Sequence, residues 1–305
     1  MEKGTDFDSI AAASVHGAKT GLADFVCADE AECFAKVRAL VDMLPANNEE
    51  DAPIYENLDD LNRVSGVLNT VVPEDGSGFD IRGILADLAD ASQFIEVKAE
   101  YAKNMVVGFL RLNGGTVGVV ANNSIEDQGV LTIGACRKAA QFVRFCDAFE
   151  LPILTVTDTA GFVSSKEEEN AGLAQAAAEL ASAFAQATVA KVNLIVGKAY
   201  GSASMVMNSK ETGADVVLAW PSAEIAVMNA QSAARILYAE ELSAGADLAE
   251  KTEAVSELST PSAAAARGSV DDVIEPAQTR KHLLVSFGML ASKRQLSPAK
   301  KHGAR

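Results

Sequence analysis

The residues with the clearest chemical use open a helix directly after a buried strand. Residues 192–197 (VNLIVG) are expected to form the strand, and Gly201, Ser202 and Ala203 follow it closely. The first N–H groups of a helix have no intrahelical acceptor and lie at the positive end of the helix dipole. Little side-chain bulk surrounds these amides, so they can donate to a developing oxyanion. The alternative is a serine-capped helix packed tightly on its strand.

A second group of small residues follows the preceding strand. Residues 152–157 (PILTVT) are expected to form that strand, with Asp158 at its end and residues 159–162 (TAGF) after it. Ligands of α/β proteins gather at the carboxyl edge of parallel strands, so the amide of Gly161 is a candidate second donor. The chain between Gly161 and Ser202 is long enough for one helix and one strand. The alternative is a turn in which Asp158 hydrogen-bonds its own backbone.

The positions of the histidines exclude several catalytic devices. His16, His282 and His302 leave residues 17–281 without an imidazole. A Ser-His-Asp triad, a Cys–His pair and a histidine-based metal site are therefore disfavoured there, and we expect no metal site. If the protein is an enzyme, its catalytic groups are expected to be backbone amides.

Composition excludes further classes of function. The 305 residues include 26 Lys and Arg against 42 Asp and Glu, a net charge of −16, which disfavours binding to nucleic acid or to an anionic membrane. No apolar run approaches the ~20 residues that a bilayer requires, and the first residues show no signal peptide. We expect a cytoplasmic protein. Its cysteines fit no CxxC pattern and are expected to be buried, reduced thiols: Cys27, Cys33, Cys136 and Cys146.

The elements that would position both donor segments alternate between strand and helix, which predicts an α/β domain with crossover connections. Residues 113–115 (NGG) join two strands as a hairpin, and 244–262 are expected to form an exposed loop or a marginal helix. The basic residues from Lys293 onward are expected to pair with the acidic surface of the chain; the alternatives are contact with a partner subunit and attraction of phosphates. Helices are predicted over 29–44, 80–103, 130–149, 168–188 and 276–292 and from 202 and 229, and strands over 105–112, 116–121, 152–157, 192–197, 215–219, 224–228 and 270–274.

Several stretches together resemble the carboxyltransferase subunits of biotin-dependent acyl-CoA carboxylases and related decarboxylases. They are residues 157–162 (TDTAGF), 198–210 (KAYGSASMVMNSK) and 213–228 (GADVVLAWPSAEIAVM). Residues 20–38 and 264–281 are also similar to the flanks of that family. The resemblance extends from about residue 14 to the end, and the joint occurrence of these stretches is highly specific.

This resemblance implies an α/β, crotonase-like fold of stacked β-β-α units with a helical N-terminal arm. In the family two such domains follow one another, and the first binds acyl-CoA while the second receives biotin. Residues 61–295 look like the second, biotin-side domain. Residues 1–60 look like an arm with a remnant of the inter-domain segment, and 296–305 form a basic tail.

The resemblance also implies a function and partners. Each active site of the family lies where the first domain of one protomer meets the second domain of another. The chain is therefore expected to be the biotin-side half of a split carboxyltransferase, which moves CO2 between carboxybiotin and an acyl-CoA. Its expected partners are a chain with the acyl-CoA-binding half and a separate biotin carboxyl carrier protein, in a homo- or hetero-oligomer between a dimer and a hexamer of dimers.

In this family the biotin nitrogen removes the acyl α-proton, so no protein base is needed and the amides stabilise negative charge. The resemblance assigns this role to Ser202, Ala203, Gly161 and Phe162. It assigns contacts with biotin to Tyr200, Gly201, Ala160 and Met228. The family usually has Gly at position 202 and Pro at position 160. A positive φ at Ser202 would cost about 1–2 kcal/mol.

Three other functions compete with this interpretation. The same half-site could serve a biotin-dependent decarboxylase of the glutaconyl-CoA or methylmalonyl-CoA type. The chain could instead be a catalytically silent assembly subunit. An independent enoyl-CoA hydratase has less support, because such an enzyme needs placed carboxylates and these motifs offer only Asp158.

Overall fold

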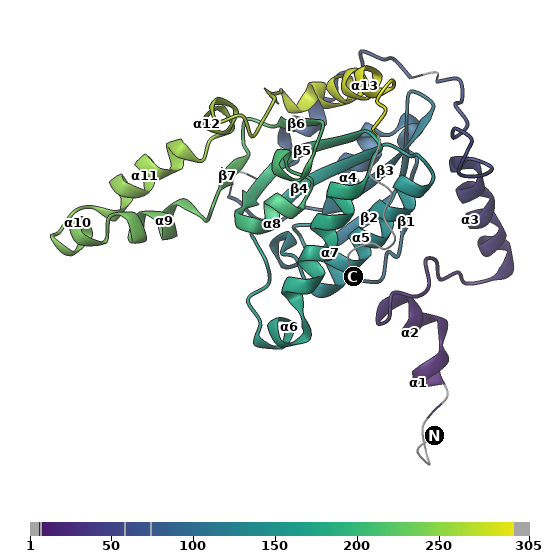
Figure 1. Cartoon of the computed structure of the whole chain (residues 1–305), viewed down its shortest axis with the longest axis horizontal. Helices are drawn as coiled ribbons and strands as arrows, with labels where there is room; N and C mark the ends of the chain where they lie inside the picture. Colours follow the sequence, from purple (N-terminus) through teal and green to yellow (C-terminus); the bar gives the residue numbers. More distant parts are fainter. Residues whose placement is uncertain (1–5, 7, 58, 74, 296–305) are drawn as a thin grey trace.

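The computed structural model describes residue 6 and residues 8–57, 59–73 and 75–295 (Figure 1). The α-helices are α1 (Asp8–Ala11), α2 (Ala13–Ala18), α3 (Glu30–Met43), α4 (Ile81–Leu88), α5 (Ile133–Ala148), α6 (Lys166–Ala171), α7 (Leu173–Gln186), α8 (Gly201–Val206), α9 (Ala230–Leu237), α10 (Ala239–Ser243), α11 (Leu248–Leu258), α12 (Pro261–Ala266) and α13 (Thr279–Leu290). The strands are β1 (Phe94–Val97), β2 (Met105–Leu112), β3 (Gly115–Asn122), β4 (Ile153–Thr159), β5 (Lys191–Tyr200), β6 (Val216–Ala219), β7 (Glu224–Ala226) and β8 (Asp272–Val273). Short 3-10 turns occur at Gly66–Thr70, Asp90–Ser92, Asp127–Gly129, Lys210–Thr212 and Pro276–Gln278.

One mixed sheet organises the described part of the chain. Its order is β1-β2-β3-β4-β5-β6-β8, and β7 pairs with β5 beside this path. The pairs β1–β2 and β2–β3 are antiparallel, and the pairs from β3 onward are parallel. The predicted hairpin is confirmed: Asn113 and Gly114 adopt φ of 52° and 76° between β2 and β3. Parallel strands joined by helices direct the ends of β4 and β5 to the same edge of the sheet.

Two apolar layers hold the sheet between helices. Buried side chains of α5 and α7 pack against one face, in a cluster that includes Phe109 and Phe184. Residues of α4 and α13 pack on the other face, around Trp220 and Leu154. Alanines at the α5–α7 contact, such as Ala139 and Ala183, allow the two helices to lie close together. Successive side chains of a strand point to opposite faces of the sheet, so each strand contributes residues to both apolar clusters.

Several predicted elements are wrong in extent. The helix predicted over 80–103 stops at Leu88, because Ala91 and Ser92 have φ of 50° and 56° and the chain then enters β1. The helix predicted over 168–188 is divided at Gly172, whose φ is 101°. For the stretch 244–262 the helical alternative is confirmed and the exposed loop is wrong, because this stretch contains α11 and the start of α12, which are capped by Asp247 and Thr260.

The cysteine and tail predictions are confirmed in part. Cys136 and Cys146 are fully buried in the cluster under α5, but Cys27 is half-buried and Cys33 is exposed. These two lie in the N-terminal arm, where little protein covers them. Lys293 pairs with Asp215 at 2.8 Å, as expected for the basic end. Residues 296–305, with Lys300, Lys301 and Arg305, lie outside the described residues.

Two helical segments extend away from the sheet, namely the arm α1–α3 and the hairpin α9–α11 (Figure 1). In the arm, Asp29 caps α3 by accepting from the Glu32 N–H at 2.8 Å, as predicted. Phe34, Val37 and Val41 follow the helical spacing of α3 and are at least half exposed. Within the described residues, no helix combines the length and apolar character needed to cross a bilayer.

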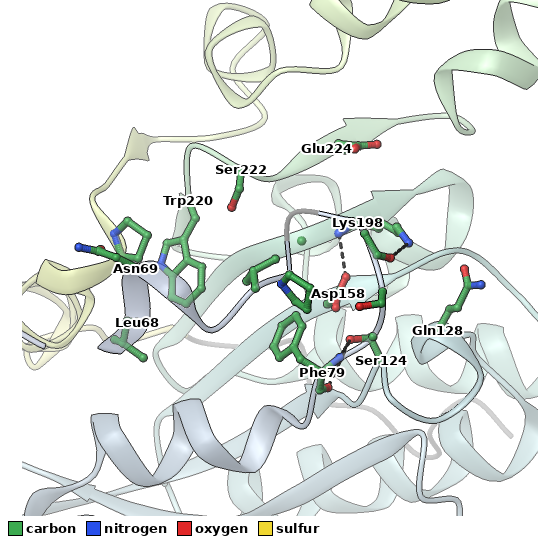
Figure 2. A pocket seen from close by; sticks show the side chains of 17 residues that line it. Leu68, Asn69, Phe79, Ser124, Gln128, Asp158, Lys198, Trp220, Ser222 and Glu224 are labelled. Carbon is green, nitrogen blue, oxygen red and sulfur yellow. Dashed lines mark hydrogen bonds between the residues drawn. The ribbon is translucent and has the colours of Figure 1, made fainter. Parts of the chain in front are cut away.

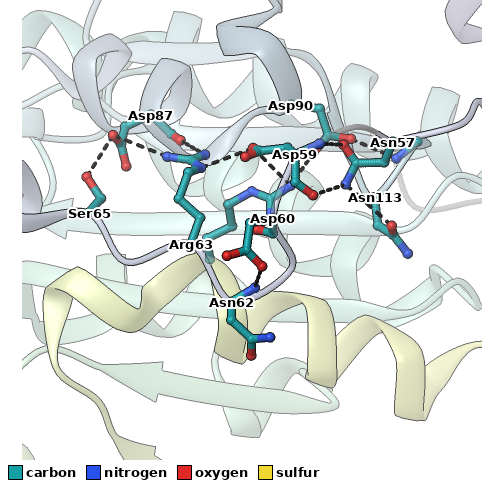
Figure 3. Close-up of polar contacts among 11 residues, drawn as sticks. Asn57, Asp59, Asp60, Asn62, Arg63, Ser65, Asp87, Asp90 and Asn113 are labelled. Atoms are coloured by element: carbon teal, nitrogen blue, oxygen red, sulfur yellow. Dashed lines mark hydrogen bonds and ion pairs between the residues drawn. The ribbon is translucent and has the colours of Figure 1, made fainter.

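A buried ionic network fastens α13 to the loops around it. The Arg280 guanidinium is 2% exposed and pairs with Asp90, while Asp59 lies 3.4 Å from it. Arg63 contacts Asp59 at 3.0 Å and Asp87 at 3.7 Å (Figure 3). Asp90 also accepts the Gly114 N–H of the hairpin turn at 2.7 Å. The network therefore joins segments far apart in the sequence.

Replacing Arg280 by Met should lower the free energy of unfolding by about 3–5 kcal/mol, since Asp90 is then buried without its cation. Urea denaturation followed by circular dichroism measures this change. Lys103→Ala is the control, because it breaks an exposed pair with Glu100 that is worth about 0–1 kcal/mol. Equal losses in the two variants would contradict a special role for the network.

Candidate active site

The two donor segments leave the sheet side by side. β4 and β5 are neighbouring parallel strands, and Thr159 is in register with Ala199. Gly161 follows Thr159 by two residues, and Ser202 follows Ala199 by three. The structure thus brings both segments to one edge of the sheet, where α/β proteins bind ligands.

At the start of helix α8 the left-handed backbone conformation falls on Gly201 and not on Ser202. Gly201 has φ of 61°, while Ser202 is absent from the left-handed residues. A Cβ at Gly201 would also lie 3.1 Å from the Val227 carbonyl oxygen. Tyr200 precedes the helix and makes no side-chain cap, and the Ala203 side chain is buried. The serine that stands where the family usually has glycine is therefore accommodated without left-handed backbone.

Gly161 lies in a turn with open space at its Cα, and its backbone groups already make hydrogen bonds. Its φ is 137°, and a Cβ added there would meet no atom within 4 Å. Its carbonyl accepts the Leu131 N–H at 2.9 Å, and its own N–H donates to the Thr159 hydroxyl at 3.3 Å. Ala160 donates to the Gln128 carbonyl at 3.3 Å. The Gly161 amide is thus shared with Thr159 through a long hydrogen bond.

A cavity of about 340 Å³ lies beside the opening of α8. Gly201 and Ser202 line it, and the Thr157 hydroxyl donates to the Asn193 carboxamide oxygen at 2.9 Å in its wall. Its other walls come largely from apolar residues of β5, β6 and β7, with Glu211 and Arg267 as its charged groups. Six of the eight predicted site residues are not among its lining, namely Ala160, Gly161, Phe162, Tyr200, Ala203 and Met228. The half-buried Phe162 packs instead against the cluster under α5.

A second cavity, of about 330 Å³, opens at Asp158 (Figure 2). Side chains alternate along β4, so Asp158 faces away from Thr157 and the first cavity. Lys198, Ser124 and Gln128 also line this second cavity, and the Lys198 ammonium donates to the Gly76 carbonyl at 2.8 Å. Sequence reasoning did not single out these three residues, although Lys198 opens one of the stretches that resemble the family.

The Asp158 carboxylate is 5% exposed and does not bond its own backbone, so the turn expected from the sequence is wrong. It accepts the Lys198 N–H at 2.8 Å. Burial raises the pKa of Asp158, and hydrogen bonds from Ser124 and from the Lys198 amide oppose this shift. The carboxylate is therefore held by donors and costs free energy to ionise.

Tyr200 and Glu224 form a hydrogen bond between β5 and β7. The Tyr200 hydroxyl donates to the Glu224 carboxylate, and these residues come from paired strands. Burial and the nearby Glu224 raise the pKa of Tyr200, so the phenol stays protonated at neutral pH. Tyr200 thus supports the strand end that leads into α8.

Comparison with known proteins identifies close relatives. The carboxyl transferase domain matches residues 3–304. The carboxyltransferase subunit of propionyl-CoA carboxylase from Haloferax mediterranei is 44% identical over 303 residues, which cover 97% of this chain and 59% of that relative. Methylmalonyl-CoA decarboxylase subunit alpha from Propionigenium modestum is 39% identical over 302 residues, with 97% and 58% covered.

Solved structures agree with this result. The transcarboxylase 12S hexamer, with methylmalonyl-coenzyme A and methylmalonic acid bound, matches with a TM-score of 0.94 at 40% identity over 97% of this chain and 58% of that chain. The predicted α/β, crotonase-like fold class is confirmed. The chain spans less than two thirds of the length of these relatives.

Gly201→Ala should lower the free energy of unfolding by about 1–2 kcal/mol, because alanine disfavours the left-handed backbone at this position. Ser202→Gly is the matched variant and should change it by no more than about 1 kcal/mol, since no left-handed strain is relieved there. Urea denaturation of both variants measures the difference. A larger loss for Ser202→Gly than for Gly201→Ala would reverse the assignment of strain.

Proposed function

Because the chain belongs to the carboxyl transferase domain family, we propose that it transfers a carboxyl group between carboxybiotin and an acyl-CoA. The observation that carries this proposal is the shared edge of β4 and β5, where the segments of Gly161 and Ser202 emerge together. Backbone amides at such an edge can stabilise negative charge without an ionisable side chain.

The cavity beside α8 is suited to a compact, uncharged ring system. It offers about 340 Å³, apolar walls, and hydroxyl and carboxamide groups at Thr157 and Asn193. The N–H groups of Ser202 and Ala203 would hold the ureido oxygen, with Gly161 and Phe162 as neighbouring donors. Of the four residues expected to contact the ring, Gly201 lines the cavity, and Tyr200, Ala160 and Met228 would contribute from outside its lining. When bound, carboxybiotin supplies the carboxyl group and a ring nitrogen that can take the acyl α-proton.

In this proposal the protein itself orients the bound ring and stabilises the negative charge that develops on its oxygen. The α8 amides lie at the positive end of a helix dipole, so they favour an oxygen that gains negative charge. The apolar walls beside the opening of α8 displace part of the water around that oxygen, which strengthens the same hydrogen bonds. No proton has to pass through a side chain of this chain.

We assign the acyl-CoA-binding half to another chain and biotin to a separate carrier protein. The proposal is supported by the 59% of a relative's length that the chain spans and by the exposed Phe34, Val37 and Val41 of α3, which suit an assembly. In this scheme residues 1–60 form the arm, 61–295 the biotin-side domain and 296–305 a basic tail. A cytoplasmic location is part of the proposal and is supported by four unpaired cysteines.

Copurification of the full chain from its host tests this scheme. Recovery of a chain with the acyl-CoA-binding half and of a biotinylated carrier supports it, and recovery of the chain by itself contradicts it. The relative named as a decarboxylase subunit favours the reverse direction as a second candidate. ATP-dependent carboxylation by the copurified complex indicates the first direction, and decarboxylation coupled to a membrane subunit indicates the second.

Ser202→Pro should lower kcat for biotin-dependent decarboxylation of malonyl-CoA or methylmalonyl-CoA by roughly 10²–10³-fold, because proline removes one oxyanion donor. Proline is tolerated in the first turn of a helix, so the variant should fold. The assay uses free biotin and the copurified complex.

Ser202→Ala is the matched control, since it removes the hydroxyl and keeps the N–H, and it should retain most of the wild-type kcat. Unchanged kcat in Ser202→Pro, with normal circular dichroism, would refute the role of this amide. A complex that binds neither biotin nor acyl-CoA would indicate an assembly subunit instead.

A further inference from the structure

The ladder between β4 and β5 shifts register just before the candidate site. Thr157 is in register with Ile195, but Thr159 is in register with Ala199. β5 therefore uses four residues where β4 uses two, which makes a bulge on β5 at residues 196–198. Bulges redirect a strand and often occur next to active sites.

This bulge also changes the neighbour of β5. Before it, residues 192–195 pair with β6, and from its last residue onward residues 198–200 pair with β7. The length of the bulge thus decides where the chain reaches α8 relative to the end of β4. One residue more or less would move the Ser202 amide by a full strand step of about 3.3 Å.

The Asp158 carboxylate occupies the bulge. It accepts the Lys198 N–H at 2.8 Å and so takes the place of the β4 carbonyl that would accept this N–H in a regular ladder (Figure 2). Gly197 leaves the space that the carboxylate needs, because a Cβ at this position would collide with both the Oδ1 and the Cγ of Asp158. Asp158 and Gly197 therefore form a matched pair across the two strands.

The other edge of β4 is also hydrogen-bonded to its neighbours. The Asp158 N–H donates to the Asn122 side-chain oxygen of β3 at 3.2 Å, and the Asn122 amide contacts the Gly129 carbonyl at 3.4 Å. Ala160 is tied to the Gln128 carbonyl. Because β4 is fixed on this side, the hydrogen bond from the Lys198 N–H to the Asp158 carboxylate fixes the position of β5 relative to β4.

We propose that Asp158 is a positioning residue, whose carboxylate sets the register of β5 against β4 and thereby the placement of the α8 amides relative to the Gly161 segment. The consequence for catalysis rests on the proposed function, while the consequence for strand register does not. Asp158 acts here through the Lys198 amide and not by contact with a substrate. An asparagine in its place keeps an acceptor of the same shape and should preserve the register.

The experiment compares Asp158→Ala, Asp158→Asn and Gly197→Ala in the full chain within its complex. In Asp158→Ala we expect kcat to fall about 100-fold, the loss that a misplacement near 1 Å can cause, while KM for acyl-CoA stays unchanged because the other half binds it. Asp158→Asn should restore most of the wild-type kcat. Hydrogen exchange of the Lys198 amide should be fast in Asp158→Ala and slow in Asp158→Asn.

A double-mutant cycle separates positioning from general destabilisation. Gly197→Ala alone should accelerate Lys198 exchange, because its methyl group collides with the carboxylate. In the Asp158→Ala background the same change should add little, since the space is then empty. Additive effects of the two substitutions would overturn the proposed pairing.

The outcomes distinguish this proposal from the proposed function. A wild-type complex without transfer activity refutes the function, and Lys198 exchange still reports on the register. A folded Asp158→Ala variant with slow Lys198 exchange and wild-type kcat overturns the proposal. If Asp158→Ala does not fold, loss of kcat and of Lys198 protection in Asp158→Asn also overturns it.

Discussion

The structure depends on the parallel pairing of β4 with β5. The position of the candidate site depends on this pair: Thr159 and Ala199 are the last paired residues of the ladder, and the small residues of both donor segments follow them. The buried layers around Phe109 on one face and Trp220 on the other keep the pair in the middle of the sheet. A site made of backbone amides requires such a frame, because an amide cannot change rotamer to correct an error in position.

The polar groups of this region fall on two sides of the sheet. Thr157 and Asn193 face the cavity beside Ser202, whereas Asp158 and Lys198 face the other cavity. This separation follows from the alternation of side chains along a strand. It explains why a protein with 42 acidic residues presents mainly hydroxyl, amide and aliphatic groups next to the α8 amides, with charge limited to Glu211 and Arg267.

Local signals in the sequence predicted local structure well. The Asn113-Gly114 turn, the Asp29 cap and the helix after β5 each depend on residues within a few positions of one another. The end of α4 was not predictable in this way, because β1 is stabilised by pairing with β2 and not by its own residues. The role of Asp158 was equally hidden, since its acceptor role involves Lys198, 40 residues away. The topology of parallel strands was sufficient to predict that the two donor segments lie at one edge of the sheet. It was not sufficient to predict the cavity lining, which includes only Gly201 and Ser202 of the predicted residues.

The change of neighbour along β5 has a mechanical consequence. The last part of this strand pairs with β7, and β7 continues almost directly into α9 and the projecting hairpin. The hairpin and α8 are thus connected to the two partners of a single three-residue ladder. A force that a bound protein exerts on the hairpin can therefore reach the opening of α8 through these three residue pairs, and it can reach the β8 edge of the sheet through α12, which follows α11 and contacts both β7 and β8.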